Sequence, residues 1–163
     1  MLAEAASAAQ QAGPVTRALS LAVLAQHADG QRSEFLKLAL DAVRETPIDI
    51  TVPSHRSYAL KFLVPFLLDD PTLRDEAIEM ILNLDREQER ATLIAALVDQ
   101  AVKRDPGLQY YLWRKSYPRL AAKPRDLLIA GLAPLVPLIE SLGGEKAIAE
   151  AGQAVVRCAA RWP

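Results

Sequence analysis

The sequence predicts an all-α protein, a right-handed α-solenoid of about four helix-turn-helix repeats followed by a C-terminal capping helix. Three observations lead to this prediction. Apolar residues recur at helical spacing along the chain, and alternating apolar and polar runs are almost absent. Alanine and leucine are abundant and only 6% of residues are aromatic, which favours helices. One pattern also returns about every 35 residues, as in stacked helical repeats.

Four similar segments mark this repeat: "RALSLAVLAQHA", "RSYALKFLVPFL", "RATLIAALVDQA" and "RDLLIAGLAPLV". They begin at Arg17, Arg56, Arg90 and Arg125, at spacings of 39, 34 and 35 residues. The seventh residue after each arginine is leucine, and the fourth is leucine or isoleucine. A second marker agrees, because Asp-Pro occurs at Asp70 and again at Asp105. Aspartate as N-cap followed by proline begins a helix.

Each unit is therefore expected to be a pair of helices. The predicted first helices cover 2–12, 32–45, 71–83 and 107–120, and the second cover 15–28, 54–69, 86–103 and 125–141. A loop, 46–53, absorbs the longer first spacing and contains the β-like stretch "IDITV". Gly143 and Gly144 end the eighth helix, and a helix over 145–161 follows. We expect one domain over 1–163, with units at about 1–30, 31–69, 70–104 and 105–142 and a capping helix at 144–163.

Local signals refine two of these helices. Asp85 and Gln88 have the spacing of a capping box, which we expect at the start of the helix predicted over 86–103. Pro65 and Pro134 both lie nine residues after a repeat arginine. Proline inside a helix removes a backbone hydrogen bond, so we expect a bend at the same phase in these two units.

Charge and composition exclude several classes of function. The net charge of −1 gives no general reason to expect nucleic acid, a membrane surface or an acidic substrate. The single cysteine, Cys158, leaves no internal disulfide and favours a cytoplasmic setting. The longest uncharged apolar run, 127–139, is too short to span a bilayer. We expect this run to be a buried helix, and we expect no membrane partner.

The repeat arginines, Arg17, Arg56, Arg90 and Arg125, are expected to be structural. Each lies near a helix N-terminus, where a cation opposes the helix dipole. Acidic residues on preceding helices, such as Asp41 and Glu79, are expected to compensate in a ladder of salt bridges. A row of arginines that grips an anionic ligand is the alternative.

The segment 108–125 is the strongest candidate for a binding site. Four of the nine aromatic residues lie within eight positions, interleaved with basic residues and without an acid. The expected partner-binding residues are Tyr110, Tyr111, Trp113, Arg114, Lys115, Tyr117 and Arg119. This composition suits a protein interface, but it also suits single-stranded nucleic acid. Packing of the rings against the terminal helix remains a third interpretation.

No group of residues predicts catalysis, a metal site or a cofactor site. His27, His55 and Cys158 lack the spacing of metal ligands. Cys158 also belongs to an apolar stripe with Ile148, Ala151, Val155 and Trp162, so we expect a buried thiol rather than a nucleophile. The chain is therefore not expected to be an enzyme.

The units and the C-terminal stretch carry a further pattern. "GLAP" lies at 131–134, a glycine pair at 143–144, and Arg-Trp-Pro at 161–163. These elements resemble the C-terminal helical-repeat arrays (HEAT- or TPR-like) of bacterial STAND-type signalling NTPases, with repeats of the form "RA-x-x-L-x-x-LAP-x-L". The resemblance implies a sensor of a protein or peptide trigger, plausibly in bacterial defence, and transfers no catalytic residue.

The nucleotide-binding domain of that family is not expected within this sequence, because no G-x-x-x-x-G-K-[ST] segment occurs in it. We therefore expect either a piece of a longer protein or a small stand-alone relative. The expected function is a non-enzymatic protein-interaction or trigger-sensing module. The alternative is a helical-repeat protein that binds nucleic acid through the segment 108–125.

Overall fold

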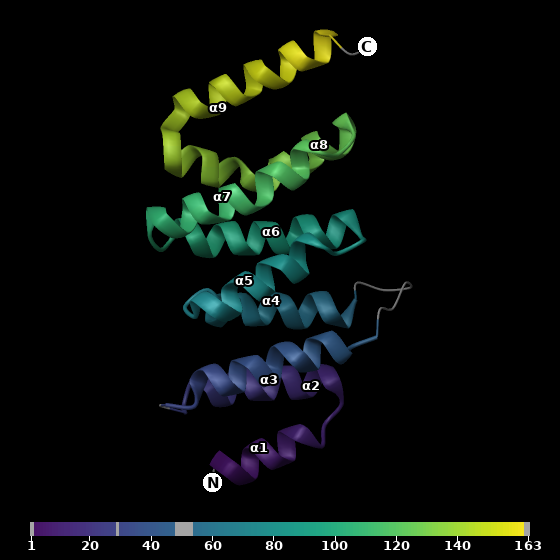
Figure 1. Cartoon of the computed structure of the whole chain (residues 1–163), viewed down its shortest axis with the longest axis vertical. Helices are drawn as coiled ribbons and strands as arrows, with labels where there is room; N and C mark the ends of the chain where they lie inside the picture. Colours follow the sequence, from purple (N-terminus) through teal and green to yellow (C-terminus); the bar gives the residue numbers. More distant parts are fainter. Residues whose placement is uncertain (1, 29, 48–53, 162–163) are drawn as a thin grey trace. The chain divides into compact units, whose positions relative to one another are not determined.

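The computed structural model describes residues 2–28, 30–47 and 54–161. It confirms the all-α prediction, since these residues form helices joined by short turns and contain no strand (Figure 1). In chain order the elements are α1 (Leu2–Gln10), α2 (Pro14–Ala25), α3 (Arg32–Glu45), α4 (His55–Leu67), α5 (Pro71–Leu82), α6 (Glu87–Val102), α7 (Pro106–Ala121), α8 (Arg125–Leu132), the 3-10 turn η1 (Ala133–Leu135) and α9 (Val136–Arg161). The β-like stretch 48–52 lies outside the described residues.

The predicted helices agree with the observed ones except near the C-terminus. The predicted helix over 125–141 is divided, because α8 ends at Leu132 and a 3-10 turn containing Pro134 follows. Proline has no N–H to continue the α-helical ladder. Gly144 then interrupts α9 with φ 66° and ψ −170°. This left-handed conformation favours glycine, so the predicted break at the glycine pair is present as a kink.

The chain forms two compact units, Met1–Leu84 and Asp85–Pro163. In the first, α2 contacts α1, α3 and α4, while α3 also contacts α4 and α5. Its core consists of large aliphatic side chains that are at most 1% exposed, including Leu21, Leu36, Leu60, Leu63 and Ile78. Each helix buries one apolar stripe, as the helical spacing predicts.

Polar contacts connect the helix ends of the first unit. Asp70 caps α5, because its carboxylate accepts the backbone N–H groups of Thr72 and Leu73 at 3.0 and 3.2 Å. The Ser33 hydroxyl at the start of α3 donates to the same carboxylate at 2.7 Å. Beside it, Arg32 pairs with Asp69 at 2.8 Å. The starts of α3 and α5 are thus joined through two neighbouring aspartates.

In the second unit, α6 contacts α7, α8, η1 and α9, and α7 contacts α8 and α9. Asp105 caps α7 by accepting the Leu108 N–H at 3.0 Å, which confirms the second Asp-Pro signal. The predicted capping box is wrong, because the N-cap of α6 is Arg86 and makes no side-chain cap bond. Since α6 begins at Glu87, Asp85 lies outside the helix and Gln88 is one position too early.

The apolar run 127–139 is not the buried helix that its composition predicts. Among its residues Leu135 and Leu138 are fully buried, while Ile129 is 43% and Val136 41% exposed. A longer helical stretch, Leu127–Arg157, satisfies the length and composition of a membrane span, because its most apolar 18-residue window has a mean hydropathy of 1.7. Only 17% of its most apolar window is buried. Neighbouring helices therefore leave much of this apolar surface uncovered.

The shared cap predicts a stability change. We expect Asp70→Ala to lower the free energy of unfolding by about 1–2 kcal/mol, because two backbone donors of α5 lose their acceptor. The matched control, Asp69→Ala, removes a carboxylate whose ion pair with Arg32 is exposed, and it is expected to cost less than about 1 kcal/mol. Urea unfolding followed by circular dichroism measures both. Equal losses in the two variants would contradict this role of Asp70.

The same contacts predict a pH dependence. The Ser33 hydrogen bond, helped by the α5 backbone donors, lowers the pKa of the Asp70 carboxyl below its usual value. Its stabilisation is complete above the unfolded-state pKa of about 4 and disappears as pH falls through the folded-state pKa. The stability difference between the wild type and Asp70→Asn should therefore shrink in acid. A difference that stays constant from neutral pH into the acid range would refute this.

Candidate functional site

Helix α7 places three of the seven predicted partner-binding residues on its outer side. Its buried stripe consists of Leu108, Leu112, Ser116 and Leu120, spaced four residues apart. This spacing keeps one side of α7 against the core of the second unit. The opposite side consequently points away from this core.

Tyr110, Arg114 and Tyr117 form this opposite side, which we call the α7 face. Their spacing of four and then three residues puts them on one surface of the helix. Tyr110 is 56% and Tyr117 45% exposed, and Arg114 is also exposed. Arg114 makes no ion pair or hydrogen bond with any residue that the structure describes. The α7 face thus presents two rings on either side of an available cation.

Half-buried side chains support the α7 face on both flanks. The ring of Trp113 stacks on Tyr117, with centroids 5.0 Å apart and planes at 21°. On the other flank, the Lys115 ammonium lies 5.6 Å from the centroid of the Tyr111 ring. Such contacts hold side chains in one arrangement before a partner arrives. Packing of the rings therefore explains Trp113 and Tyr111 in part, but it leaves Tyr110 and Tyr117 exposed.

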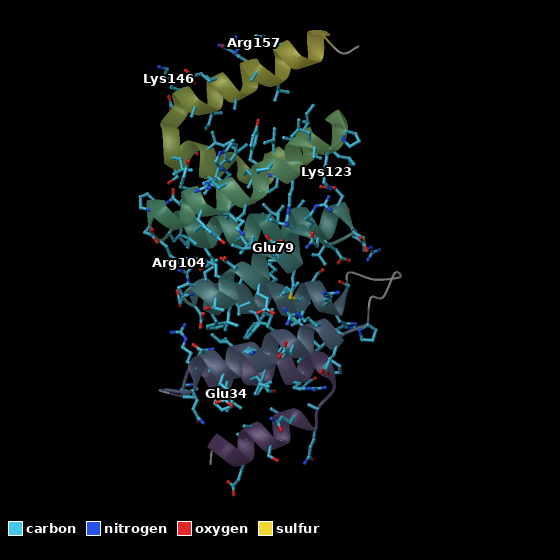
Figure 2. The ribbon with its side chains drawn as sticks, in the orientation of Figure 1. Glu34, Glu79, Arg104, Lys123, Lys146 and Arg157 are labelled. Atoms are coloured by element: carbon cyan, nitrogen blue, oxygen red, sulfur yellow. The ribbon has the colours of Figure 1, made fainter. Side chains whose placement is uncertain are left out.

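The remaining basic residues of segment 108–125 do not join the α7 face. Arg119 is half-buried and lies toward the core side of α7. Lys123 lies in the turn after α7 (Figure 2), where its ammonium is 3.3 Å from the Glu87 carboxylate. The side chain of Arg125 lies outside the described residues. The structure thus divides the basic cluster that the sequence places together.

The repeat arginines Arg17, Arg56 and Arg90 differ from one another in their contacts. Arg17 pairs with Glu45 of α3 at 3.1 Å, and Arg90 pairs with Glu87 of its own helix. Arg56 makes no ion pair within the described part of the chain. Asp41, an expected partner, pairs with Arg44 at 2.8 Å instead. Arg44 lies one turn along the same helix, so it reaches Asp41 without crossing to another helix.

Arg90, Glu87 and Lys123 form the most buried charged group among the described residues. Arg90 is only 6% exposed, and burial lowers the pKa of its guanidinium, opposed by the charge of Asp85. Burial and the nearby Arg90 charge also lower the pKa of the Lys123 ammonium. One carboxylate therefore serves two cations, and it ties the start of α6 to the turn between α7 and α8. This arrangement is suited to structural support.

The described residues contain no group of three His, Cys, Asp or Glu side chains that could hold a metal ion. A shallow hollow on α9 is lined by Ala149, Gly152, Gln153, Val156 and Arg157, with one charged side chain among them. The stripe of Ile148, Ala151 and Val155 is half-buried, not buried as predicted. Few helices cover this part of α9. The side chain of Cys158 and all of Trp162 lie outside the described residues.

Sequence reasoning missed a second set of exposed aromatic side chains, on α4. Tyr58 is 62% and Phe62 38% exposed, and Phe66 is half-buried. They recur every four residues, so they share one side of the helix. The sequence contains a signal for this set: the three aromatic residues do not occupy the positions that are apolar in all four similar segments.

No protein-family model, curated protein or solved structure matches the chain. The function is therefore argued from the chain's own residues.

The buried charge group predicts a selective loss of stability. We expect Glu87→Gln to cost about 1–3 kcal/mol, since it leaves the buried Arg90 without its carboxylate. Asp99→Asn on the same helix is the matched control, because it disrupts only exposed contacts with Lys103 and Gln100 and should cost much less than Glu87→Gln. Chemical unfolding of both variants provides the comparison. A loss for Glu87→Gln no larger than that of the control would show that this carboxylate does not compensate Arg90.

Proposed function

We propose that this chain is a non-enzymatic helical-repeat module that binds a protein or peptide through the α7 face. The exposure of Tyr110, Arg114 and Tyr117 on one side of α7, away from its buried stripe, carries the proposal. A right-handed solenoid of four repeats remains the proposed architecture. It is supported by contacts between helices two apart in the first unit, α2 with α4 and α3 with α5, as in stacked hairpins.

The composition of the α7 face suits protein recognition. Tyrosine, tryptophan and arginine are the residues most enriched where protein interfaces gain their affinity. Tyrosine also contributes a large contact area with little loss of conformational freedom. Stacking of Trp113 on Tyr117 at 5.0 Å reduces that loss further. A partner would therefore meet a partly preorganised surface.

Charge favours protein over nucleic acid as the partner. Nucleic-acid binding gains most of its affinity from several cations that contact phosphates. On the α7 face only Arg114 is available, because Lys115 lies over Tyr111 and Lys123 contacts Glu87. The segment 108–125 is rich in basic residues, but two of them, Lys115 and Lys123, already contact other residues of the chain. Nucleic acid is the second candidate, favoured only by the absence of acids in 108–125.

The biological setting is also a proposal. The elements at 131–134, 143–144 and 161–163 are those that resemble the sensor arrays of STAND-type NTPases. They support recognition of a trigger in the cytoplasm, coupled to a nucleotide-dependent switch. Under this proposal the helical array supplies the binding surface, and the chemistry belongs to a nucleotide-binding domain.

Substitution of the α7 face tests the proposal. We expect the triple variant Tyr110→Ala/Arg114→Ala/Tyr117→Ala to lose at least about tenfold in affinity for its protein partner, because it removes both rings and the cation. Partners are captured from the source cells and quantified by mass spectrometry, and the affinity of each is then measured with the purified protein. The control is Lys146→Ala/Glu150→Ala, an exposed pair on α9, which should bind normally.

Salt dependence separates the two candidates. A protein complex at the α7 face should weaken only modestly between about 0.05 and 0.2 M salt, whereas binding through many phosphate contacts would fall by about a thousandfold or more. Binding of single-stranded DNA with the steep dependence, lost in the triple variant, would replace the protein proposal. Partners that bind the triple variant and the wild type equally would remove the α7 face from the function.

A further inference from the structure

Helix α4 has an outer side that the fold of the first unit does not use. Its core residues are Ala59, Leu60, Leu63, Val64 and Leu67, each at most 1% exposed. The opposite side carries Tyr58, Phe62 and Phe66 at intervals of four residues, with Tyr58 62% exposed. We call these three residues the α4 face. Large aromatic side chains exposed in a row add nothing to the core, and exposed apolar patches commonly mark interaction sites.

The repeat itself shows that the scaffold does not require aromatic residues here. Tyr58 and Phe62 lie two and six residues after Arg56. The same positions after Arg90 hold Thr92 and Ala96, and α6 forms a regular helix with them. The rings of the α4 face are therefore specific to the repeat that begins at Arg56, as a recognition surface would be.

The surroundings of the α4 face are basic. His55, Arg56 and Lys61 lie on α4, and no acid occurs between Ser54 and Leu68. His55 and Lys61 are exposed, and neither pairs with a residue that the structure describes. Helix α2, which contacts α4, also lacks acids, and its Val23 is 44% exposed. Helices α3 and α5 contact α4 as well, and their acids Asp41, Glu45, Asp75 and Glu76 are paired with arginines of the first unit. An apolar strip beside the Lys61 cation and the polar His55 ring is complementary to a segment with apolar anchors and carboxylates.

From these observations we propose that the α4 face is a second docking surface, and that it binds an acidic amphipathic segment of a partner protein. The segment's apolar side chains cover Tyr58, Phe62 and Val23, and its carboxylates reach Lys61 and His55. This surface belongs to the first unit and involves no residue of the α7 face.

Ring geometry favours a protein over single-stranded nucleic acid at this surface. Phe62 and Phe66 pack against each other, with centroids 5.9 Å apart and planes at 49°. Bases bind on rings that offer a free flat face, and this tilted pair offers less of one. Aliphatic side chains, in contrast, can fill the angle between tilted rings.

Selection from a peptide library tests the inference directly, because the library itself supplies the candidate segments. Short random peptides displayed on phage are selected on the full chain, and the enriched peptides are synthesised and measured by fluorescence anisotropy. We expect the enriched set to combine aspartate or glutamate with apolar residues. Tyr58→Ala/Phe62→Ala should weaken their binding at least about tenfold, and Lys61→Glu should weaken it through charge repulsion.

Leu142→Ala is the matched control, because it removes a side chain of the second unit that is 38% exposed, as Phe62 is, and that belongs to neither face. It should leave these peptides bound at wild-type affinity. Circular dichroism melts establish that each variant is folded, and Lys61→Glu keeps the test valid if the double variant unfolds. The inference is overturned by enriched peptides without acidic residues, or by equal affinity for wild type and both α4 variants. Competition by oligo-dT, or self-association abolished by Tyr58→Ala/Phe62→Ala, would assign the face to another occupant.

Discussion

A single geometric constraint underlies most of the structure: from α2 to α7, each helix buries one stripe of apolar side chains and leaves other parts of its surface uncovered. The stripe of α4 runs from Ala59 to Leu67 and that of α7 from Leu108 to Leu120. Burial of leucine and alanine stabilises both helices. The composition of the other side is then unconstrained by folding. Aromatic and basic residues on the uncovered side therefore indicate a binding surface more strongly than the same residues would inside a core.

The helix starts are the second feature on which the structure depends, because a chain of helices joined by short turns needs a new start for each helix. Asp70 and Asp105 provide these starts with a carboxylate that accepts backbone N–H groups. The start of α6 has no such cap, and there the contacts of Glu87 with Arg90 and Lys123 hold the helix end. A buried charge group thus replaces a local hydrogen bond. This group also connects segments far apart in the sequence.

The helices could be predicted from the sequence because their signals are local. Apolar spacing, Asp-Pro pairs and the glycines at 143–144 all act within one or two turns. The start of α6 could not be predicted from the sequence, because it depends on the contact between Lys123 and Glu87, which lie 36 residues apart. Exposure of the run 127–139 was also missed, since composition does not reveal which neighbours cover a helix. The pairing of Arg17 with Glu45, on the helix that follows it rather than on a preceding one, reflects the same dependence on helix packing.

The residues of the candidate site could be predicted from the sequence, but the directions in which their side chains point could not. The cluster from Tyr110 to Arg119 is visible in the sequence, yet only the buried stripe through Leu112 shows that Tyr110, Arg114 and Tyr117 point outward. The α4 face was overlooked because Phe62 resembles any apolar residue of a repeated helix. Comparison of equivalent repeat positions would have separated it, as Thr92 and Ala96 show.

The kink at Gly144 has a consequence for how the chain resists proteases. A protease needs an extended stretch of backbone in its active site, and loops between helices usually supply one. Here the chain changes direction at a single left-handed residue, with helix on both sides. The bend offers no extended stretch, so we expect proteases to cleave the chain here more slowly than at a loop that makes the same change of direction.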